Sequence, residues 1–270
     1  MNKKLFSLVA LLLCFVCVFS ACSTNKDANR GREINSVNHR GYCDAPENTL
    51  SAFRLSAEMG FSMVECDVSF TKDGVPVLLH DTTVNRTSNG KGEIRDLTFQ
   101  EVRQLDFGSW KGAEYEGEQI PAFSEFLQLC SELTLHPYVE VKSGATENEV
   151  ELLAQMVDEA GIDVTWISFE YDVLYQLAQI VPNGRFGYLV HFLTDLVISR
   201  IVRISTSTNY VFADCFYLTL TDSQIESCKD NAIPVEVWTL NSARKIADLN
   251  PYVSGVTSDS VNAESVFAEL

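Results

Sequence analysis

Short apolar runs with strand-like composition alternate with helix-like segments along most of this 270-residue chain. This alternation is typical of an α/β fold in which a parallel sheet is covered by helices. About eight strands of this kind in one domain fit a (β/α)₈ TIM barrel. The expected strands cover residues 37–40, 63–70, 137–142, 165–169, 186–190, 210–213, 235–240 and 255–257, with helices over 49–59, 122–135, 147–160, 171–180, 222–230 and 242–249.

An open, doubly wound sheet is the alternative architecture. Polar residues mark the ends of several expected strands, and barrel enzymes build their sites where the carboxyl ends of the strands meet, which favours the barrel. One segment interrupts the alternation after the second strand. A further strand over 75–80 leads into residues 81–119, which are rich in glycine and charge and too long for a simple loop. We therefore expect a small insertion over the barrel mouth, within a barrel domain that spans residues 34–270.

The polar residues at the strand ends form one set. Burying a charged group costs several kcal/mol unless it is paired or binds a metal, so charges in strands that are covered on both faces indicate a functional site. The set consists of His39, Arg40, Glu65, Asp67, His80, Glu140 and Lys142.

The acidic members of the set suit a metal ion. Glu65 and Asp67 are two residues apart in a strand and share one face, as do Glu140 and Lys142. Three carboxylates that converge from two strands provide the oxygen ligands preferred by Mg²⁺ or Ca²⁺. A solvated strand face for Glu65 and Asp67 fits poorly in a barrel. For Glu140 and Lys142, a mutual ion pair is the alternative.

The remaining members suit a phosphate ester. Arg40 can bind two phosphate oxygens at once, and Lys142 can add a point charge. His39 and His80 can act as general base and general acid, because imidazole titrates near neutral pH. With a divalent cation to neutralise charge, the set fits hydrolysis of a phosphate ester.

Several further residues are candidates for supporting roles. Glu47 could bind the metal, hold Arg40, or favour the helix that begins near Thr49. Trp238 and Asn241 close the expected strand 235–240 at the same mouth, where Trp238 could contact an apolar part of a substrate or seal the barrel. His136 lies at a strand start and is expected to be structural. His191 follows a strand and could face the mouth, but it has no partner motif and is expected to be a surface or loop residue.

The pattern of the amino-terminal residues indicates a targeting segment. Asn2-Lys3-Lys4 is basic, residues 5–19 are apolar, and Ser20-Ala21-Cys22 places small residues before a cysteine. We expect a lipoprotein-type signal over 1–22, with Cys22 as the lipid-modified residue. Residues 23–33 are expected to be a flexible tether. These features predict an exported protein anchored on the outer face of a bacterial membrane, with plain secretion or an uncleaved anchor as alternatives.

The net charge and the cysteine content argue against a nucleic-acid-binding protein and against a zinc protein. The chain has 37 acidic and 20 basic residues, a formal charge of −17, which argues against a nucleic-acid partner. Outside the signal and Cys22 there are five cysteines without CxxC spacing, which argues against a zinc site. Cys66 alternates with Glu65 and Asp67 and is expected in the core, whereas a disulfide among the others is left open.

The ordered motifs resemble those of the glycerophosphodiester phosphodiesterases over about residues 37–261. The matching pieces are His39-Arg40-Gly41, Ala45-Pro46-Glu47-Asn48-Thr49, Val64-Glu65-Cys66-Asp67-Val68, Thr71-Lys72-Asp73-Gly74, His80-Asp81, Arg86-Thr87, Glu140-Val141-Lys142 and Trp238-Thr239-Leu240-Asn241. The resemblance implies a barrel with a small insertion. It also implies a divalent metal on Glu65, Asp67 and Glu140, acid–base histidines at His39 and His80, and Arg40 and Lys142 on phosphate.

The implied reaction is hydrolysis of deacylated phospholipids to sn-glycerol 3-phosphate and an alcohol. Two routes are open: the glycerol hydroxyl next to the phosphate attacks first and gives a cyclic intermediate that water then opens, or water attacks directly. The segment Gly255–Val261 departs from the family pattern, with Ser258 in place of Thr and no nearby Pro, which affects substrate preference at the mouth more than the chemistry. Three alternatives stay open: a phospholipase, a phosphodiesterase that acts on polymers, and a surface binding protein whose barrel has lost catalytic activity. The head group and the choice between Ca²⁺ and Mg²⁺ are not readable from the sequence.

Overall fold

A computed structural model describes residues 25–270 of the chain. The expected signal over 1–22, the lipid site at Cys22 and the first two residues of the tether lie outside these described residues.

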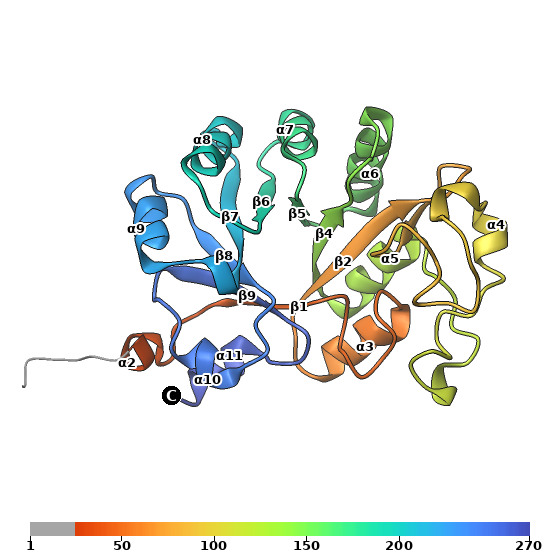
Figure 1. The fold of residues 1–270 in the computed structure, drawn as a ribbon, viewed down its shortest axis with the longest axis horizontal. Helices are drawn as coiled ribbons and strands as arrows, with labels where there is room; N and C mark the ends of the chain where they lie inside the picture. The colour runs from red at the N-terminus through yellow and green to blue at the C-terminus, as the bar shows by residue number, and fades with distance from the viewer. Residues whose placement is uncertain (1–24) are drawn as a thin grey trace, which may run out of the picture.

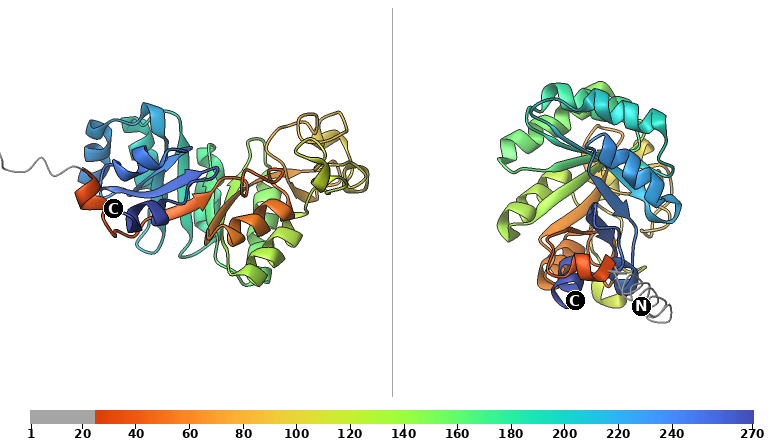
Figure 2. Two further views of the ribbon diagram at one scale, coloured as in Figure 1. Left: turned by 90° about the horizontal axis from the view of Figure 1, so that it is seen from below. Right: turned by 90° about the vertical axis from the view of Figure 1, so that its left-hand side faces the viewer.

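Eight parallel strands close into a barrel, as predicted. Each strand pairs in parallel with the next, and β1 pairs with both β9 and β2, which closes the ring and rules out the open sheet. Figure 2 shows the helices arranged around the strands. The strands are β1 (Asn35–Asn38), β2 (Met63–Phe70), β4 (His136–Val141), β5 (Thr165–Ser168), β6 (Arg185–Val190), β7 (Tyr210–Phe216), β8 (Val235–Trp238) and β9 (Val253–Ser258).

Helices cover the outside of the barrel (Figure 1). Several begin at capping residues: Thr146 accepts a hydrogen bond from the Glu149 backbone N–H, and Thr221 does the same for Gln224. The helix α8 was not among the expected elements. The helices are α3 (Leu50–Glu58), α5 (Phe123–Leu133), α6 (Glu147–Ala160), α7 (Tyr171–Ile180), α8 (Asp195–Ile204), α9 (Asp222–Asp230), α10 (Ala243–Ala247) and α11 (Ala263–Ala268).

The strands bury residues on both faces. The outward faces carry apolar side chains such as Val64, Val139 and Trp166, which pack against the helices. A smaller apolar cluster inside the barrel includes Tyr138 and Phe212. Since outward positions are apolar, the charged residues of β2 and β4 alternate with them and project into the barrel. Cys66 is fully buried, as expected, and the five cysteines of the described residues are all unpaired.

The strand expected over 75–80 is not a barrel strand. Its ordered part, β3 (Pro76–Leu78), pairs antiparallel with the end of β2 through Val68 and Leu78. The chain then forms short helical turns at Ile94–Asp96, α4 (Phe99–Val102) and Ala113–Tyr115 around a separate apolar cluster that includes Val84 and Phe107. This insertion lies at one end of the molecule, at the right of Figure 1, opposite the carboxyl terminus.

The expected tether is ordered in its described part. Residues Asn25–Asn29 form the helix α2, and the buried Asn29 amide donates hydrogen bonds to the carbonyls of Ala247 (3.2 Å) and Leu249 (2.9 Å). This contact was not visible in the sequence because Asn29 and its partners are more than 200 residues apart. In residues 25–270, no helix has the length and apolar character needed to cross a membrane.

Candidate active site

The carboxyl ends of β1, β2 and β4 bring the predicted polar set together. His39 and Arg40 follow β1 directly, and Glu65 and Glu140 lie within β2 and β4. A cavity of about 240 Å³ opens at this end and is lined by these four residues and by His80. The cavity therefore lies at the face where barrel enzymes build their sites.

Three carboxylates form a compact buried cluster. Glu65, Asp67 and Glu140 each place an oxygen within 4.8 Å of the others, and Asp67 and Glu140 are register partners on adjacent strands. The backbone N–H of Arg40 donates to Glu65 Oε2 (3.0 Å), whereas the buried Glu65 Oε1 has no hydrogen-bond partner among the described residues. Clustered buried oxygens with one unpaired atom fit a divalent cation such as Mg²⁺ or Ca²⁺.

Two cationic side chains contact this cluster. Lys142 Nζ lies 3.0 Å from Asp67 Oδ1 and 2.6 Å from Glu140 Oε1, so the ion pair considered for Glu140 is present but extends to a second acid. Arg40 Nε lies 3.1 Å from Asp67 Oδ2, a charge contact without hydrogen-bond geometry. Of the two, Arg40 also lines the cavity.

The acids differ in their pKa. Burial would raise the pKa of Asp67, but Lys142 and Arg40 outweigh it and hold that pKa below its usual range. Burial, with Asp67 beside it, raises the pKa of Glu140 to about 7. Burial and the two neighbouring carboxylates raise the pKa of Glu65 well above its usual range. Such opposed shifts within a few ångströms are typical of functional sites and metal sites.

His39 is held by a carboxylate from the far end of the chain. Its Nδ1 lies 2.7 Å from Asp259 Oδ1, at the end of β9. Asn241 donates to the other oxygen of Asp259 and accepts from the Asp259 backbone N–H (2.8 Å). This arrangement fixes the imidazole ring and leaves Nε2 available, so Asn241 supports the site through Asp259.

His80 is held in the same way by its neighbour. Its Nδ1 lies 2.7 Å from Asp81 Oδ1, and Arg86 donates to both Asp81 oxygens. The hydrogen bonds from Arg86 lower the pKa of Asp81 to about 2. Burial lowers the pKa of His80 together with Lys142 and Arg40, against the opposite effect of Asp67.

Glu47 holds arginines and is not part of the acid cluster. It accepts a hydrogen bond from Arg40 (3.0 Å) and two from Arg86 (2.6 and 2.8 Å). Of the three roles considered for Glu47, the contacts match the one in which it holds Arg40. It also links the two halves of the site, because Arg86 binds the carboxylate that orients His80.

The loop after β1 needs unusual backbone conformations. Arg40 and Asn48 have φ of 55° and 58°, and Gly41 has φ of 82°. A Cβ at Gly41 would come within 2.5 Å of the Ala52 Cβ, so only glycine fits there. Asn48 donates to Asp67 Oδ2 (2.7 Å) and accepts from the Asp67 backbone N–H (3.1 Å). Strained loops of this kind concentrate at functional sites.

The opposite side of the cavity is aromatic. Phe169, His191 and Trp238 line it, and their ring centroids are 5.2 to 5.5 Å apart. Trp238 is half-buried, and its indole N–H donates to the Asp214 carbonyl (3.0 Å). His191 is exposed in the loop after β6, as expected, and its ring also stacks on Phe169 and forms part of the cavity wall, the mouth-facing alternative.

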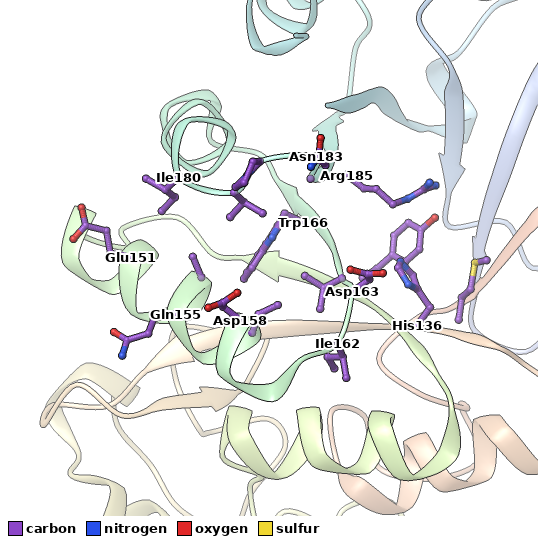
Figure 3. Close-up of a pocket in the computed structure, with 18 of the residues that line it drawn as sticks. His136, Glu151, Gln155, Asp158, Ile162, Asp163, Trp166, Ile180, Asn183 and Arg185 are labelled. Atoms are coloured by element: carbon purple, nitrogen blue, oxygen red, sulfur yellow. The ribbon is translucent and has the colours of Figure 1, made fainter. Parts of the chain in front are cut away.

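A wider hollow of about 1170 Å³ lies at the amino end of the barrel (Figure 3). It is lined by His136, Asp163 and Arg185, and by none of the strand-end set. His136 Nε2 lies 2.9 Å from Thr165 Oγ1, which agrees with the structural role expected for this histidine. The predicted site residues that line a cavity therefore lie at the other, carboxyl end of the barrel.

Three contacts in the site were missed in the sequence. Asp259 was assigned only to the shape of the mouth, yet it holds His39. Arg86 and Asn48 were quoted in motifs without a role, yet they bind Asp81 and Asp67. Asn48 and Arg86 lie in the motifs that resemble the family, which signalled that they matter but not which residues they contact.

Comparisons with known proteins agree with this geometry. Residues 39–263 match the glycerophosphoryl diester phosphodiesterase family. A glycerophosphodiester phosphodiesterase from Caldanaerobacter subterraneus subsp. tengcongensis is 30% identical over 76% of this chain and 85% of its own length. The Bacillus subtilis relative YhdW is 32% identical over 83% of this chain and 93% of its own.

A solved structure is similar along most of the chain. It is a phosphodiesterase from Oleispira antarctica in complex with the product sn-glycerol-3-phosphate. The two chains superpose with a TM-score of 0.78 at 27% identity, over 86% of this chain and 94% of that one. With the barrel, the strand-end set and these relatives together, the chain belongs to the glycerophosphoryl diester phosphodiesterase family.

Proposed function

We propose that this phosphodiesterase hydrolyses glycerophosphodiesters, the deacylated phospholipids, to sn-glycerol 3-phosphate and an alcohol, with a divalent cation held by Glu65, Asp67 and Glu140. Family membership supports the reaction class. The product bound to the Oleispira antarctica relative supports the nature of the product. The compact acid cluster, with its unpaired Glu65 oxygen, supports the cation site.

The single observation that carries the proposal is the pairing of the acid cluster with two oriented histidines. His39 and His80 line one cavity, and a carboxylate binds Nδ1 of each. Each ring therefore presents Nε2 for proton transfer. Two such groups on one cavity suit a reaction that removes a proton from an attacking hydroxyl and returns one to a leaving alkoxide.

The remaining side chains have roles in this reaction. Arg40 and Lys142 lie beside the acids and bind the phosphate oxygens, which orients the ester. One histidine takes the proton of the attacking hydroxyl or water at its Nε2, and the other donates a proton to the leaving oxygen. A bound divalent cation would supply charge neutralisation at the phosphoryl oxygens. Glu47, Asn48 and Asn241 hold these groups in place.

Product release tests the reaction. The purified chain is incubated with glycerophosphocholine and added Mg²⁺, added Ca²⁺ or excess chelator, and sn-glycerol 3-phosphate is measured. We expect release that depends on one of the two metals and stops with chelator. Release that persists in chelator would contradict the cation site. A folded chain without release under any condition would favour intact lipid or a polymer as substrate.

For the cellular location, we propose export and lipid attachment at Cys22. The basic, apolar and small-residue pattern of residues 2–22 supports this proposal. Growth of the expressing bacterium with a clickable fatty acid should label the native chain but not the Cys22→Ala variant. Equal labelling of the two would exclude Cys22 as the lipid site.

A further inference from the structure

Residues 25–33, here called the strap, are fixed to the body of the barrel. At the start of the strap, the Asn25 amide donates a hydrogen bond to a carbonyl at the end of α10 (3.0 Å), and Asn29 adds the two hydrogen bonds described above. Near its end, Arg32 donates to the first carbonyl of β9 (2.9 Å). The strap therefore moves with the barrel and does not act as a flexible tether.

The strap lies at the amino end of the barrel, away from the catalytic cavity. Its partners at the end of α10 and the start of β9 lie where the chain enters the barrel. The Gly31 N–H also donates to the carbonyl of Phe267 (2.9 Å), near the end of α11. Figure 1 shows α2 and the insertion at opposite ends of the molecule. A strand such as β4, with six residues, spans about 20 Å between the two ends of the barrel.

The proposed lipid site is close to the strap along the chain. Cys22 precedes Asn25 by three residues. Because an extended chain spans at most about 3.6 Å per residue, Cys22 lies within about 11 Å of Asn25 by any path. This reach is shorter than the barrel. A bilayer that holds a lipid on Cys22 therefore meets the amino end of the barrel and leaves the carboxyl end free.

The surface at the amino end carries little negative charge. The seven loops that lead from a helix into a barrel strand contain two charged residues, Asp163 and Asp248. The strap has a net charge of +1 in a chain whose formal charge is −17, because three of its charged residues are basic and two are acidic: Lys26, Arg30, Arg32, Asp27 and Glu33. This face therefore meets less repulsion at an anionic bilayer surface than the rest of the chain would.

The rim of the catalytic mouth is the rival surface for a bilayer. Phe192, Leu196 and Leu218 lie in or next to the loops after β6 and β7 and are 67%, 60% and 70% exposed. Exposed apolar side chains of this kind can enter a lipid interface. The reach from Cys22 decides between the two surfaces, since a bilayer at the rim would lie beyond the reach of the lipid site.

We propose that the amino end of the barrel, with the strap, rests on the bilayer that holds the lipid on Cys22, and that the catalytic mouth faces the aqueous space. This inference rests on the proposed attachment at Cys22 and goes beyond the proposed reaction. It also restricts the source of the substrate. Glycerophosphodiesters without acyl chains diffuse to the mouth, whereas intact phospholipids of the anchoring bilayer stay at the opposite end of the enzyme.

Fluorescence quenching by lipid tests this orientation. The native lipidated chain is reconstituted on vesicles whose lipid headgroups carry a nitroxide, a quencher that acts at contact. One dye is attached to Cys43, the exposed cysteine of the described residues, in the loop after β1 at the mouth. In a second protein, Cys43→Ser with Ser207→Cys, the dye lies in the exposed loop between α8 and β7 at the amino end. We expect quenching at position 207 and none at Cys43, because about 20 Å separates the two ends.

A longer tether is the matched control, since it leaves every contact of the strap intact. About twenty Gly and Ser residues inserted between Thr24 and Asn25 extend the reach to about 25 Å, which exceeds the length of the barrel. Quenching at Cys43 should appear in this variant, and the difference between the two positions should shrink. Quenching at Cys43 that equals or exceeds quenching at position 207 in the native chain would overturn the orientation.

Flotation of the vesicles separates this inference from the proposals on which it rests. A chain that does not float with the vesicles refutes attachment through Cys22, and the orientation fails with it. A chain that floats with its Cys43 dye quenched refutes the orientation alone. Neither readout uses hydrolysis, so release of sn-glycerol 3-phosphate from glycerophosphocholine still decides the proposed reaction independently.

Discussion

The two ends of the barrel both bury carboxylates, but with different partners. At the carboxyl end, Glu140 lies with Glu65 and Asp67, and Lys142 contacts two of the three. Toward the amino end, Glu236 accepts hydrogen bonds from the Asn35 amide (2.8 Å) and the Tyr138 hydroxyl (3.4 Å). Burial raises the pKa of both Glu140 and Glu236 to about 7.

A pKa raised to about 7 therefore occurs at two carboxyl groups with different surroundings. At Glu236, burial raises the pKa, and the hydrogen bonds from Asn35 and Tyr138 and the charge of Arg185 lower it by less. The carboxyl-end acids share two cations, leave one oxygen unpaired and face two histidines across a cavity. Burial and a raised pKa alone thus do not identify a site, whereas clustering with cations and oriented histidines does.

The largest effect should follow loss of an acid from the cluster. Glu65→Gln keeps the side-chain shape but removes the charge of the carboxylate with the unpaired oxygen. We expect kcat/KM for glycerophosphocholine to fall by about a thousandfold or more, since several kcal/mol of charge stabilisation are removed. Activity of this variant within about tenfold of the unaltered chain would mean that the carboxyl-end acids are not distinguished from Glu236 by a role in the reaction.

The next effect should follow loss of either histidine. His39→Ala and His80→Ala should each lower kcat by about a hundredfold or more, the scale of acid–base catalysis. Steady-state kinetics with circular dichroism as a folding control provides the measurement. Near-normal rates in both variants would mean that proton transfer depends on other groups.

A smaller effect is expected at Asp259. Asp259→Asn keeps the contact with His39 but removes the negative charge that stabilises the protonated ring. We expect a loss of about tenfold to a hundredfold in kcat, with a changed pH–rate profile and a KM close to normal. A reduced rate with an unchanged pH profile would mean that Asp259 stabilises the fold and does not act on the His39 ring.

The smallest effect on activity is expected at Glu236, where the change is in stability. The pKa of Glu236 is raised in the folded state, so the unfolded chain releases this proton first, and stability declines as pH rises from about 4.5 to about 7. Glu236→Gln removes this decline. Its free energy of unfolding relative to the unaltered chain should rise by about 2 kcal/mol between pH 5 and pH 8. Urea denaturation at the two pH values measures this change, and a flat difference would refute it.

The barrel and the members of the site were predictable because both depend on local sequence. Strand–helix alternation predicts the parallel barrel, and paired positions such as Glu65 and Asp67 must share a face in any strand. The helix α8 was missed although Val197, Ile198 and Ile201 follow helical spacing. The segment over 75–80 was placed among the strands, but its antiparallel pairing depends on the turn at Asp73-Gly74 and on the insertion that follows.

The supporting contacts were not predictable because they join distant segments. Asp259 is 220 residues from His39, and Arg86 is 39 residues from Glu47. Spacing along the chain carries no information about such pairs until the barrel closes and brings β9 beside β1. The aromatic partners of His191 were not predictable for the same reason, since Phe169 and Trp238 come from other strand–loop units.

Direct measurement of metal binding tests the contrast between the two ends most closely. Isothermal titration calorimetry with Mg²⁺ and Ca²⁺ on the unaltered chain, Glu65→Gln and Glu236→Gln gives stoichiometry without any assay of activity. We expect one divalent ion per chain for the unaltered protein and for Glu236→Gln, and no measurable binding for Glu65→Gln. Binding that survives in Glu65→Gln, or that is lost in Glu236→Gln, would contradict a metal site at the carboxyl end.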